Sequence, residues 1–422
     1  MNERVAMLAG LIEKSMNLGP EWTVSDVEFR EGLPTGDELH IFIERTPGSA
    51  VECPSCHCRC GVYDARPGEW RHLDIWQYKT IIHCDVPRAD CPECGVKTSR
   101  VPWASEDAAR FTALFEAHAL LMVMSGMPVS GAAKVLRLND TVLWRMLNRL
   151  AERARAQVSF EGVTRVGVDE TARRRGHNYL TAFVDLDVQR AMFCCEGRDA
   201  SAVAAFAADL EAHGGKASAV ETVTCDLSPA FASGVAEHLP KAKRVADRFH
   251  VMQIANRQLD LVRAGEARES EEKRRLLKRT KYVWLKREEN LTARQLETKR
   301  SLAAENLKTG RACAMVEALR RAYDTCETAE EAKAELDALT SWIMHSNVPQ
   351  MKKLARTLRD NEAEVLAYFK ERATNAILEG MNSVIQAAKR AARGFRNTEY
   401  FKTVIYLKLG KLPLVDAVCA TH

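Results

Sequence analysis

Length, composition and charge already limit what this chain can be. Of its 422 residues, 46% are hydrophobic and 28% are charged, and 61 Lys and Arg against 57 Asp and Glu leave a net charge of +4. These proportions exclude a disordered or fibrous protein. Apolar runs such as Ala119–Met124 are far shorter than the ~18 residues of a membrane helix, and no signal-peptide cleavage pattern follows the N-terminal apolar run. We expect a cytoplasmic protein of about three domains.

Residues 1–50 are expected to form a short helix followed by two strands. Apolar and polar residues alternate over Thr23–Phe29 and again over Glu38–Glu44. The segment Gly32–Gly36 is rich in turn-forming residues and separates the two runs.

A cysteine-rich segment at residues 51–104 predicts a zinc-binding domain. Seven of the 13 cysteines lie in it, and they include two Cys-Pro-x-Cys motifs. Two residues between thiolates allow one tight turn to present both sulfurs to the same tetrahedral ion. We therefore expect one structural Zn²⁺, with strands at Trp70–Tyr78 and Thr80–Val86 bringing the two motifs together. Its ligands would be Cys53, Cys56, Cys91 and Cys94.

Two alternatives to this ligand set remain open. Four ordinary buried cysteines would need no metal, although two copies of the motif in one short segment favour zinc. The segment also contains further potential ligands, which are Cys58, Cys60, His57, His83 and Cys84.

Residues 105–157 have a helical pattern that indicates a helix-turn-helix. A short helix at Pro128–Leu136, capped by Ser130, would be followed by a turn and then by a second helix at Thr141–Leu150. Apolar residues at helical spacing form one stripe of the second helix: Leu143, Met146, Leu147 and Leu150. Its free face carries the candidate DNA-binding residues Thr141, Arg145, Asn148 and Arg149. A plain helical hairpin is the alternative.

Residues 160–250 change to alternating strands and helices. Strands are predicted at Arg165–Asp169, Tyr179–Asp185, Arg190–Cys195, Glu221–Asp226 and Arg244–Asp247, with helices at Ala200–His213 and Pro229–Leu239. This order is expected of a mixed sheet with helices on its faces. Four of these strands end in an aspartate, and among these aspartates Asp169 and Asp226 are the candidate catalytic carboxylates.

Residues 251–370 are predicted to be helical and strongly charged. Residues 241–300 contain 18 Lys or Arg and 9 Asp or Glu, a local excess of +9 (18 minus 9). The densest part consists of Lys273, Arg274, Arg275, Lys278, Arg279 and Lys281, with Tyr282 and Trp284 alongside. This excess beside aromatic residues favours a surface for a phosphate backbone, with an ordinary solvated helix face as the alternative.

A third carboxylate, Glu379, lies on a helix predicted over Asn375–Arg393, within residues 371–422. With 3.6 residues per turn, one face would carry Ile377, Met381, Val384, Ile385, Ala388 and Ala392. The opposite face would carry Glu379, Ser383, Gln386, Arg390 and Arg393. Candidate DNA contacts on this helix are Asn382, Lys389, Arg390 and Arg393, a solvated face being the alternative.

Carboxylates brought together at strand ends repel one another unless a cation lies between them, which makes these acidic residues candidate metal ligands. The motifs together resemble the bacterial insertion-sequence transposases of the ISL3 family. The matching stretches are Val168–Thr171, Thr224–Phe231, Val245–His250 and Asn375–Arg396, and the cysteine motifs and the helix-turn-helix stand where that family carries them.

The resemblance implies an α+β multidomain protein. Its parts would be a zinc-binding module, a helix-turn-helix, and an RNase H-like α/β catalytic core (160–250 and 371–422) interrupted by an all-helical insertion at 251–370. It also implies that Asp169, Asp226 and Glu379 form a DDE catalytic triad.

The implied reaction is phosphodiester hydrolysis followed by strand transfer at two Mg²⁺ ions, or Mn²⁺ in their place. Such ions lie about 3.5–4 Å apart and clamp the attacking and leaving oxygens. The partners would be transposon ends and target DNA, bound by a homodimer at the nucleoid. Asp247 and His250 could line the site or hold a phosphate, or Asp247 could instead cap a helix or pair with Arg248.

Two other functions are compatible with the same modules. One is a zinc and helix-turn-helix DNA-binding regulator whose RNase H-like domain has lost activity; the complete set of three carboxylates disfavours it. The other is a structure-specific nuclease, which would not need two N-terminal DNA-binding modules.

Overall fold

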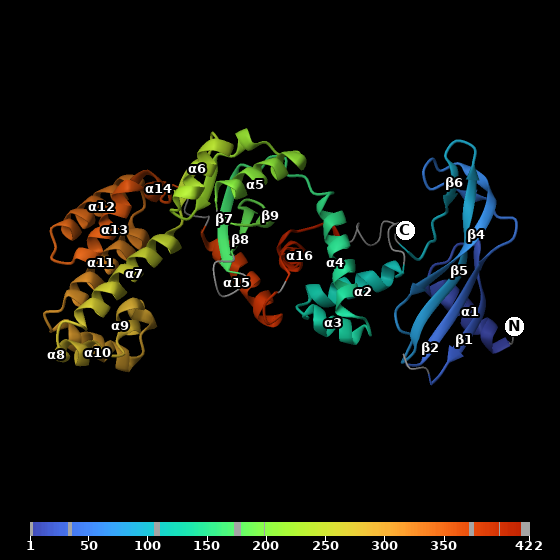
Figure 1. The fold of residues 1–422 in the computed structure, drawn as a ribbon, viewed down its shortest axis with the longest axis horizontal. Coiled ribbons are helices and arrows are strands. Elements are labelled where there is room, and N and C mark those ends of the chain that lie inside the picture. Colours follow the sequence, from blue (N-terminus) through green and yellow to red (C-terminus); the bar gives the residue numbers. More distant parts are fainter. Residues whose placement is uncertain are drawn as a thin grey trace. The chain divides into compact units, whose positions relative to one another are not determined.

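The computed structural model describes residues 3–32, 36–104, 110–172, 179–197, 199–370, 375–395 and 397–414 (Figure 1). It divides into two units, which are described separately. The first runs to Val158 and includes a few residues near the C-terminus, and the second comprises Ser159–Arg390 and Gly394–Lys411. None of the described helices is both long and apolar enough to cross a bilayer.

The first unit begins with helix α1 (Glu3–Ser15) and a six-stranded sheet. Its strands are β1 (Trp22–Arg30), β2 (Glu38–Arg45), β3 (Val51–Glu52), β4 (Arg59–Arg71), β5 (Lys79–Cys91) and β6 (Gly95–Thr98). The order is β1-β2-β5-β4-β3, with β6 also paired to β5. Because β2 pairs with β5 in parallel, the N-terminal strands and the cysteine-rich segment share one sheet.

The predicted strand at Trp70–Tyr78 is wrong, because β4 ends at Arg71. The buried Arg71 guanidinium donates to the carbonyl of His72 and to Asp74, which turns the chain back at once. Trp76 then adopts a left-handed φ of 54° that a strand cannot accommodate. The strand predicted at Thr80–Val86 is confirmed within the longer β5.

Three helices complete the first unit: α2 (Ala113–Met124), α3 (Val129–Val135) and α4 (Asp140–Arg155). The predicted apolar stripe of α4 is confirmed, since Leu143, Met146, Leu147 and Leu150 are at most 3% exposed. The predicted cap Ser130 is wrong, because α3 begins at Val129 and its N-cap position, Pro128, makes no side-chain cap. Asn139 caps α4 instead, through the Thr141 N–H.

The second unit contains a five-stranded mixed sheet, and all five predicted strands are present. They are β7 (Arg165–Ala172), β8 (Tyr179–Asp185), β9 (Arg190–Glu196), β10 (Thr222–Cys225) and β11 (Lys243–Ala246). The order is β11-β10-β7-β8-β9. The chain from β7 to β9 forms an antiparallel meander, whereas β10 and β11 run parallel to β7. Helices α5 (Ala200–Ala212) and α6 (Pro229–His238) connect these strands.

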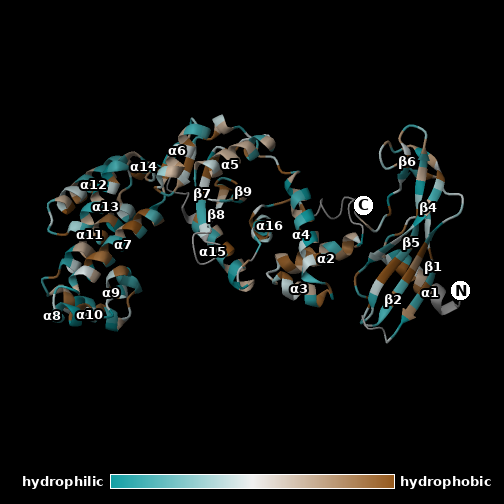
Figure 2. Ribbon diagram, in the orientation of Figure 1, coloured by the Kyte–Doolittle hydropathy of each residue, from teal (hydrophilic) through white to brown (hydrophobic). Residues whose placement is uncertain are grey.

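Residues 248–370 form helices and their connections, without a strand. The α-helices are α7 (Arg248–Glu266), α8 (Glu271–Leu277), α9 (Lys281–Leu285), α10 (Ala293–Ala303), α11 (Lys308–Thr325), α12 (Ala329–Met344), α13 (Pro349–Asp360) and α14 (Glu362–Ala367). Their own core includes the fully buried Leu319, Ile343 and Leu354. Figure 2 shows α8 and α10 as largely hydrophilic.

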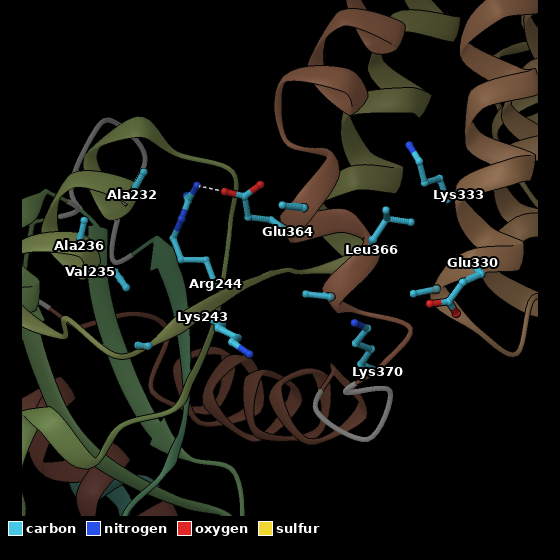
Figure 3. A pocket seen from close by; sticks show the side chains of 14 residues that line it. Ala232, Val235, Ala236, Lys243, Arg244, Glu330, Lys333, Glu364, Leu366 and Lys370 are labelled. Atoms are coloured by element: carbon cyan, nitrogen blue, oxygen red, sulfur yellow. Dashed lines mark hydrogen bonds and ion pairs between the residues drawn. The ribbon is translucent and has the colours of Figure 1, made fainter.

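A cavity of about 630 Å³ lies between α6 and β11 on one side and α12 and α14 on the other (Figure 3). Lys243, Lys333 and Lys370 line it, and an ion pair joins Arg244 of β11 to Glu364 of α14. The cavity lies toward the start of β11, whereas the acidic residues considered below follow the ends of their strands.

Two C-terminal helices, α15 (Asn375–Ala391) and α16 (Thr398–Leu409), return to the sheet. α16 packs beside β9, where the Cys194 N–H donates to the Tyr406 hydroxyl at 2.8 Å. The prediction that α15 continues to Arg393 is wrong by two residues. Arg393 and Gly394 have φ of 54° and 92°, and the Gly394 N–H returns to the Lys389 carbonyl at 2.9 Å, which ends the helix.

The predicted apolar face of α15 is also partly wrong. Leu378, Met381 and Ile385 are buried, but Val384 is 39% exposed. The stripe is rotated toward Leu378 because this side chain lies against Gly167 of β7, where a Cβ would come within 2.6 Å of it. α15 therefore meets β7 at the one residue of that stretch that has no side chain.

Candidate active site and zinc centre

Three aspartates lie side by side toward the C-terminal ends of the neighbouring parallel strands β7, β10 and β11. Thr224 of β10 is in register with Gly167 of β7 on one side and with Val245 of β11 on the other. Side chains two residues apart share a face of a strand, so the positions two residues further on form a row across neighbouring strands. These positions are Asp169, Asp226 and Asp247.

Local hydrogen bonds fix each of these carboxylates. Asp169 accepts from the Glu170 N–H at 2.7 Å, and Asp226 accepts from the Ser228 N–H at 2.9 Å. Asp247 caps α7 by accepting from the Phe249 N–H at 2.9 Å, which confirms the helix-cap interpretation of this residue. The alternative ion pair between Asp247 and Arg248 is not formed, because Arg248 pairs with Asp324.

His250 lies between two of the aspartates. Its Nε2 is 3.9 Å from an Asp169 oxygen and 3.7 Å from an Asp247 oxygen. Burial raises the pKa of Asp247 to about 6, and the negative charges of Asp169 and Glu379 act in the same direction. Burial alone would lower the pKa of His250, but the neighbouring Asp169 and Asp247 raise it overall. The site is thus a concentration of negative charge that favours a cation.

Helix α15 brings the third predicted carboxylate to this edge. Asn382 donates from Nδ2 to the second oxygen of Asp169, and Gln386 donates to the Thr171 hydroxyl at 2.8 Å. Glu379 precedes Asn382 by about one helical turn and therefore lies on the same side of α15. Its exposed side chain lines a cavity together with Arg248, Phe249 and Met252 of α7.

The oxygen donors fit hard divalent cations such as Mg²⁺. Among the described His, Cys, Asp and Glu residues, however, the groups that bring three or more ligand atoms within 4.8 Å of one another consist of cysteines. Asp169, Asp226 and Glu379 are thus not all within shared-ligand distance of one another in this structure.

The four predicted zinc ligands do converge. The sulfurs of Cys53, Cys56, Cys91 and Cys94 all lie within 4.8 Å of one another. The residue after each motif has a left-handed backbone, with φ of 61° at His57 and 73° at Gly95. Hydrogen bonding from the Cys94 N–H lowers the pKa of Cys91 to about 6, although burial opposes this. Four thiolates presented by two tight turns are suited to a closed tetrahedral Zn²⁺ site.

The four residues predicted to form the DNA-binding face of α4 differ in their exposure and contacts. Thr141 and Arg145 are exposed and Asn148 is half-buried. Arg149 instead pairs with Glu116 of α2, whose side chain is fully buried. Arg137 of the α3–α4 turn pairs with Asp74 and donates to the Gln77 carbonyl at 3.0 Å, which ties this turn to the β4–β5 loop.

The predicted basic cluster lies on and just after α8. Arg274 and Arg275 are largely exposed beside Glu271, and Lys273 pairs with Glu269. Lys278 and Arg279 are also exposed. Of the two aromatic residues expected beside this cluster, Tyr282 is 61% exposed. The expectation is wrong for Trp284, which is 2% exposed and belongs to the core of the helical region.

The candidate DNA contacts of α15 lie on several sides of the helix. Arg390 and Arg393 are exposed, whereas Lys389 is half-buried. Asn382 donates a hydrogen bond to Asp169 and therefore lies within the acidic site. Helical spacing could predict that Asn382 lies near Glu379 on α15. It could not predict the hydrogen bond from Asn382 to Asp169.

Three family models match consecutive parts of the chain. A zinc-finger of the transposases IS204, IS1001, IS1096 and IS1165 matches residues 49–101, and the helix-turn-helix domain of transposase family ISL3 matches residues 100–151. A model described as a transposase of the same family matches residues 166–405, more than half of the chain. The chain belongs to the ISL3 transposase family.

Curated relatives of this transposase match over almost their whole length. The transposase for insertion sequence element IS1557 of Mycobacterium tuberculosis is 27% identical over 419 residues, which covers 92% of each chain. The transposase for IS1001 of Bordetella parapertussis is 26% identical over 405 residues, covering 94% of this chain and 97% of its own. The predicted family is therefore confirmed, as are the zinc-finger and helix-turn-helix modules.

Proposed function

We propose that this ISL3 transposase binds the terminal inverted repeats of its insertion sequence, cleaves the DNA there and joins the freed ends to target DNA. Asp169, Asp226 and Glu379 would hold two divalent metal ions for both steps. The observation that carries this proposal is the bond from Asn382 to Asp169, because it holds the helix that carries Glu379 against the row of strand-end carboxylates.

The domain that performs this reaction is proposed to be RNase H-like. The order β11-β10-β7-β8-β9, with a three-stranded meander followed by two parallel strands, supports this assignment. Residues 251–370 would then be a helical insertion between the second and third members of the triad, and 371–422 would complete the core. The N-terminal divisions would be 1–50, 51–104 and 105–157, with β2 and β5 joining the first two in one sheet.

When bound, two Mg²⁺ ions, or Mn²⁺, would polarise the scissile phosphate and the attacking oxygen. Asp169 would be kept in place for this task by the Glu170 N–H and by Asn382, and Asp226 by the Ser228 N–H. Asp247 would add negative charge that helps to retain the ions, and His250, which lies between Asp169 and Asp247, would pair with these carboxylates when no ion is bound. Glu379 would approach from α15, on the side where its side chain lines a cavity together with Arg248 and Phe249 of α7.

Three further surfaces would hold the DNA. Thr141, Arg145 and Asn148 of α4 would contact base edges or phosphates in a groove, while Arg149 braces the helix through Glu116. The cluster of Lys273, Arg274, Arg275, Lys278 and Arg279, together with Lys389, Arg390 and Arg393 of α15, would contact phosphates. The transposase would act as a homodimer on two ends, at the nucleoid of the cytoplasm.

The decisive experiment compares cleavage with binding. Asp226→Ala is expected to abolish Mg²⁺-dependent cleavage of inverted-repeat DNA and to retain end binding in a mobility-shift assay. Asp187→Ala is the matched control, since this exposed aspartate pairs with Arg165 at the other end of the sheet and should leave cleavage intact. Cleavage by Asp226→Ala at the wild-type rate would refute the triad. Binding without cleavage in the wild type would favour a DNA-binding regulator.

A further inference from the structure

Six cysteines, rather than four, gather at the zinc module. Cys58 and Cys60 join the four predicted ligands in one cluster, in which Cys53, Cys60 and Cys91 are buried with Val51 and Ala89 and the other three cysteines are partly buried. The Cys58 sulfur lies 3.2 Å from that of Cys56, 3.4 Å from that of Cys91 and 3.3 Å from that of Cys60. The Cys56 and Cys91 sulfurs are themselves 3.5 Å apart. Cys58, Cys60 and Cys91 also bring their sulfurs within 4.8 Å of one another.

The backbone directs both additional thiols toward the cluster. The Cys53 N–H donates to the Cys58 carbonyl at 2.9 Å, which fixes the chain immediately after the first motif. Cys60 is held by its pairing with Val51 in the β3–β4 ladder. Cys58 and Cys60 are two residues apart in an extended segment, so their side chains project to the same face. That face is the one on which Cys91 lies.

We propose that these six cysteines bind two Zn²⁺ ions as a six-thiolate cluster. Two tetrahedral ions require eight sulfur positions, so two of the six sulfurs must be shared. Cys56 and Cys91 are the two shared ligands, because each lies within 3.5 Å of Cys58 and of the other. Cys53 and Cys94 would complete the first ion, and Cys58 and Cys60 the second.

The distances and the charge agree with this assignment. Sulfurs on one tetrahedral ion with Zn–S bonds of ~2.3 Å lie about 3.8 Å apart. Three of the four ligands of the second ion, Cys58, Cys60 and Cys91, already lie within 4.8 Å of one another, and Cys56 would move toward Cys60 as this ion binds. One ion with four thiolates has a net charge of −2, and two ions with six thiolates have the same charge. Binding the second ion therefore requires only the release of the Cys58 and Cys60 protons. Arg100, which donates to the Pro54 carbonyl at 3.3 Å, lies beside the first motif.

The proposal extends the zinc-finger assignment and is independent of the catalytic mechanism. A second ion would join the start of β4 to both cysteine motifs, where the β3–β4 ladder itself has two residue pairs. The second ion would thus stabilise this short ladder, because a structural Zn²⁺ contributes directly to the free energy of folding.

The test is the number of zinc ions bound by the full-length protein. Elemental analysis after zinc loading and desalting is expected to give two ions per chain for the wild type and one for the Cys58→Ser/Cys60→Ser variant. Cys195→Ser, in the other unit, is the matched control and should retain two. Asp226→Ala should also retain two, which separates this cluster from a metal bound at the carboxylates.

A second measurement does not depend on variants that fold. Cadmium-113 NMR of the cadmium-loaded chain is expected to give two resonances that are coupled through the shared sulfurs. One ion per wild-type chain, an unchanged count in the double variant, or two uncoupled resonances would each overturn the proposal.

Discussion

At the scale of single residues, the candidate active site depends on groups that hold the carboxylates rather than on the carboxylates alone. Asp169 receives one hydrogen bond from its own strand and one from Asn382, more than two hundred residues later in the chain. Groups that orient metal ligands in this way usually contribute strongly to metal affinity and activity.

Asn382→Ala should therefore lower the rate of DNA cleavage by about 10- to 100-fold and raise the Mg²⁺ concentration needed for half-maximal activity. End binding in a mobility-shift assay should not change. Ser383→Ala, at the next and exposed position of α15, is the matched control. Equal cleavage by both variants would show that Asn382 does not position Asp169.

Arg149 and Arg145 lie one helical turn apart on α4 but should behave differently. Arg149→Ala removes a partner of the fully buried Glu116 and should lower the free energy of unfolding by about 2 kcal/mol, measured by urea denaturation. Arg145 is exposed, so Arg145→Ala should leave stability unchanged and weaken DNA binding. Similar stability of both variants would contradict the bracing role of Arg149.

At the scale of secondary-structure elements, the site requires a close approach between α15 and β7. Gly167 permits it, since a Cβ at this position would come within 2.6 Å of Leu378 and 2.8 Å of Leu186. Both neighbours are buried, so neither can easily move away. The same contact sets the distance of Asn382 and Glu379 from the aspartate row.

Gly167→Ala should displace α15 and reduce cleavage at least 10-fold, with a loss of about 1–3 kcal/mol in stability from overpacking. Faster hydrogen exchange in α15 should accompany the loss of activity. Gly310→Ala in α11, where a Cβ would meet nothing within 4 Å, is the control and should leave cleavage unchanged without lowering stability. Normal cleavage by Gly167→Ala would mean that the position of α15 does not govern the site.

The sequence could predict elements whose patterns are local. The order of short strands and helices predicted over residues 160–250 is present as β7–β11 with α5 and α6, and helical spacing predicted the buried stripe of α4. The failures come from side-chain contacts, one of them with a residue far along the chain and one within the same loop. Val384 is exposed because α15 turns toward Gly167, and the strand predicted through Trp76 is interrupted because the Arg71 side chain binds its own loop. Periodicity within one segment carries no information about such contacts.

At the scale of the whole molecule, the zinc-finger and helix-turn-helix modules precede the transposase domain, which matches residues 166–405. The assignment of Asp169, Asp226 and Glu379 as a catalytic triad rests on motif order and family resemblance and stays a prediction. Their arrangement could not be predicted from the sequence, because it depends on the register of β7, β10 and β11 and on a helix that follows more than a hundred intervening residues. The row of Asp169, Asp226 and Asp247 emerges only from that register.

The most direct test is a crystal structure of the transposase with an inverted-repeat end and Mn²⁺, read by anomalous scattering. We expect two anomalous peaks about 3.5–4 Å apart beside the scissile phosphate, with Asp169, Asp226 and Glu379 as the protein ligands. Peaks located elsewhere, or Glu379 remaining outside coordination distance of any ion while DNA is bound, would contradict the proposed mechanism.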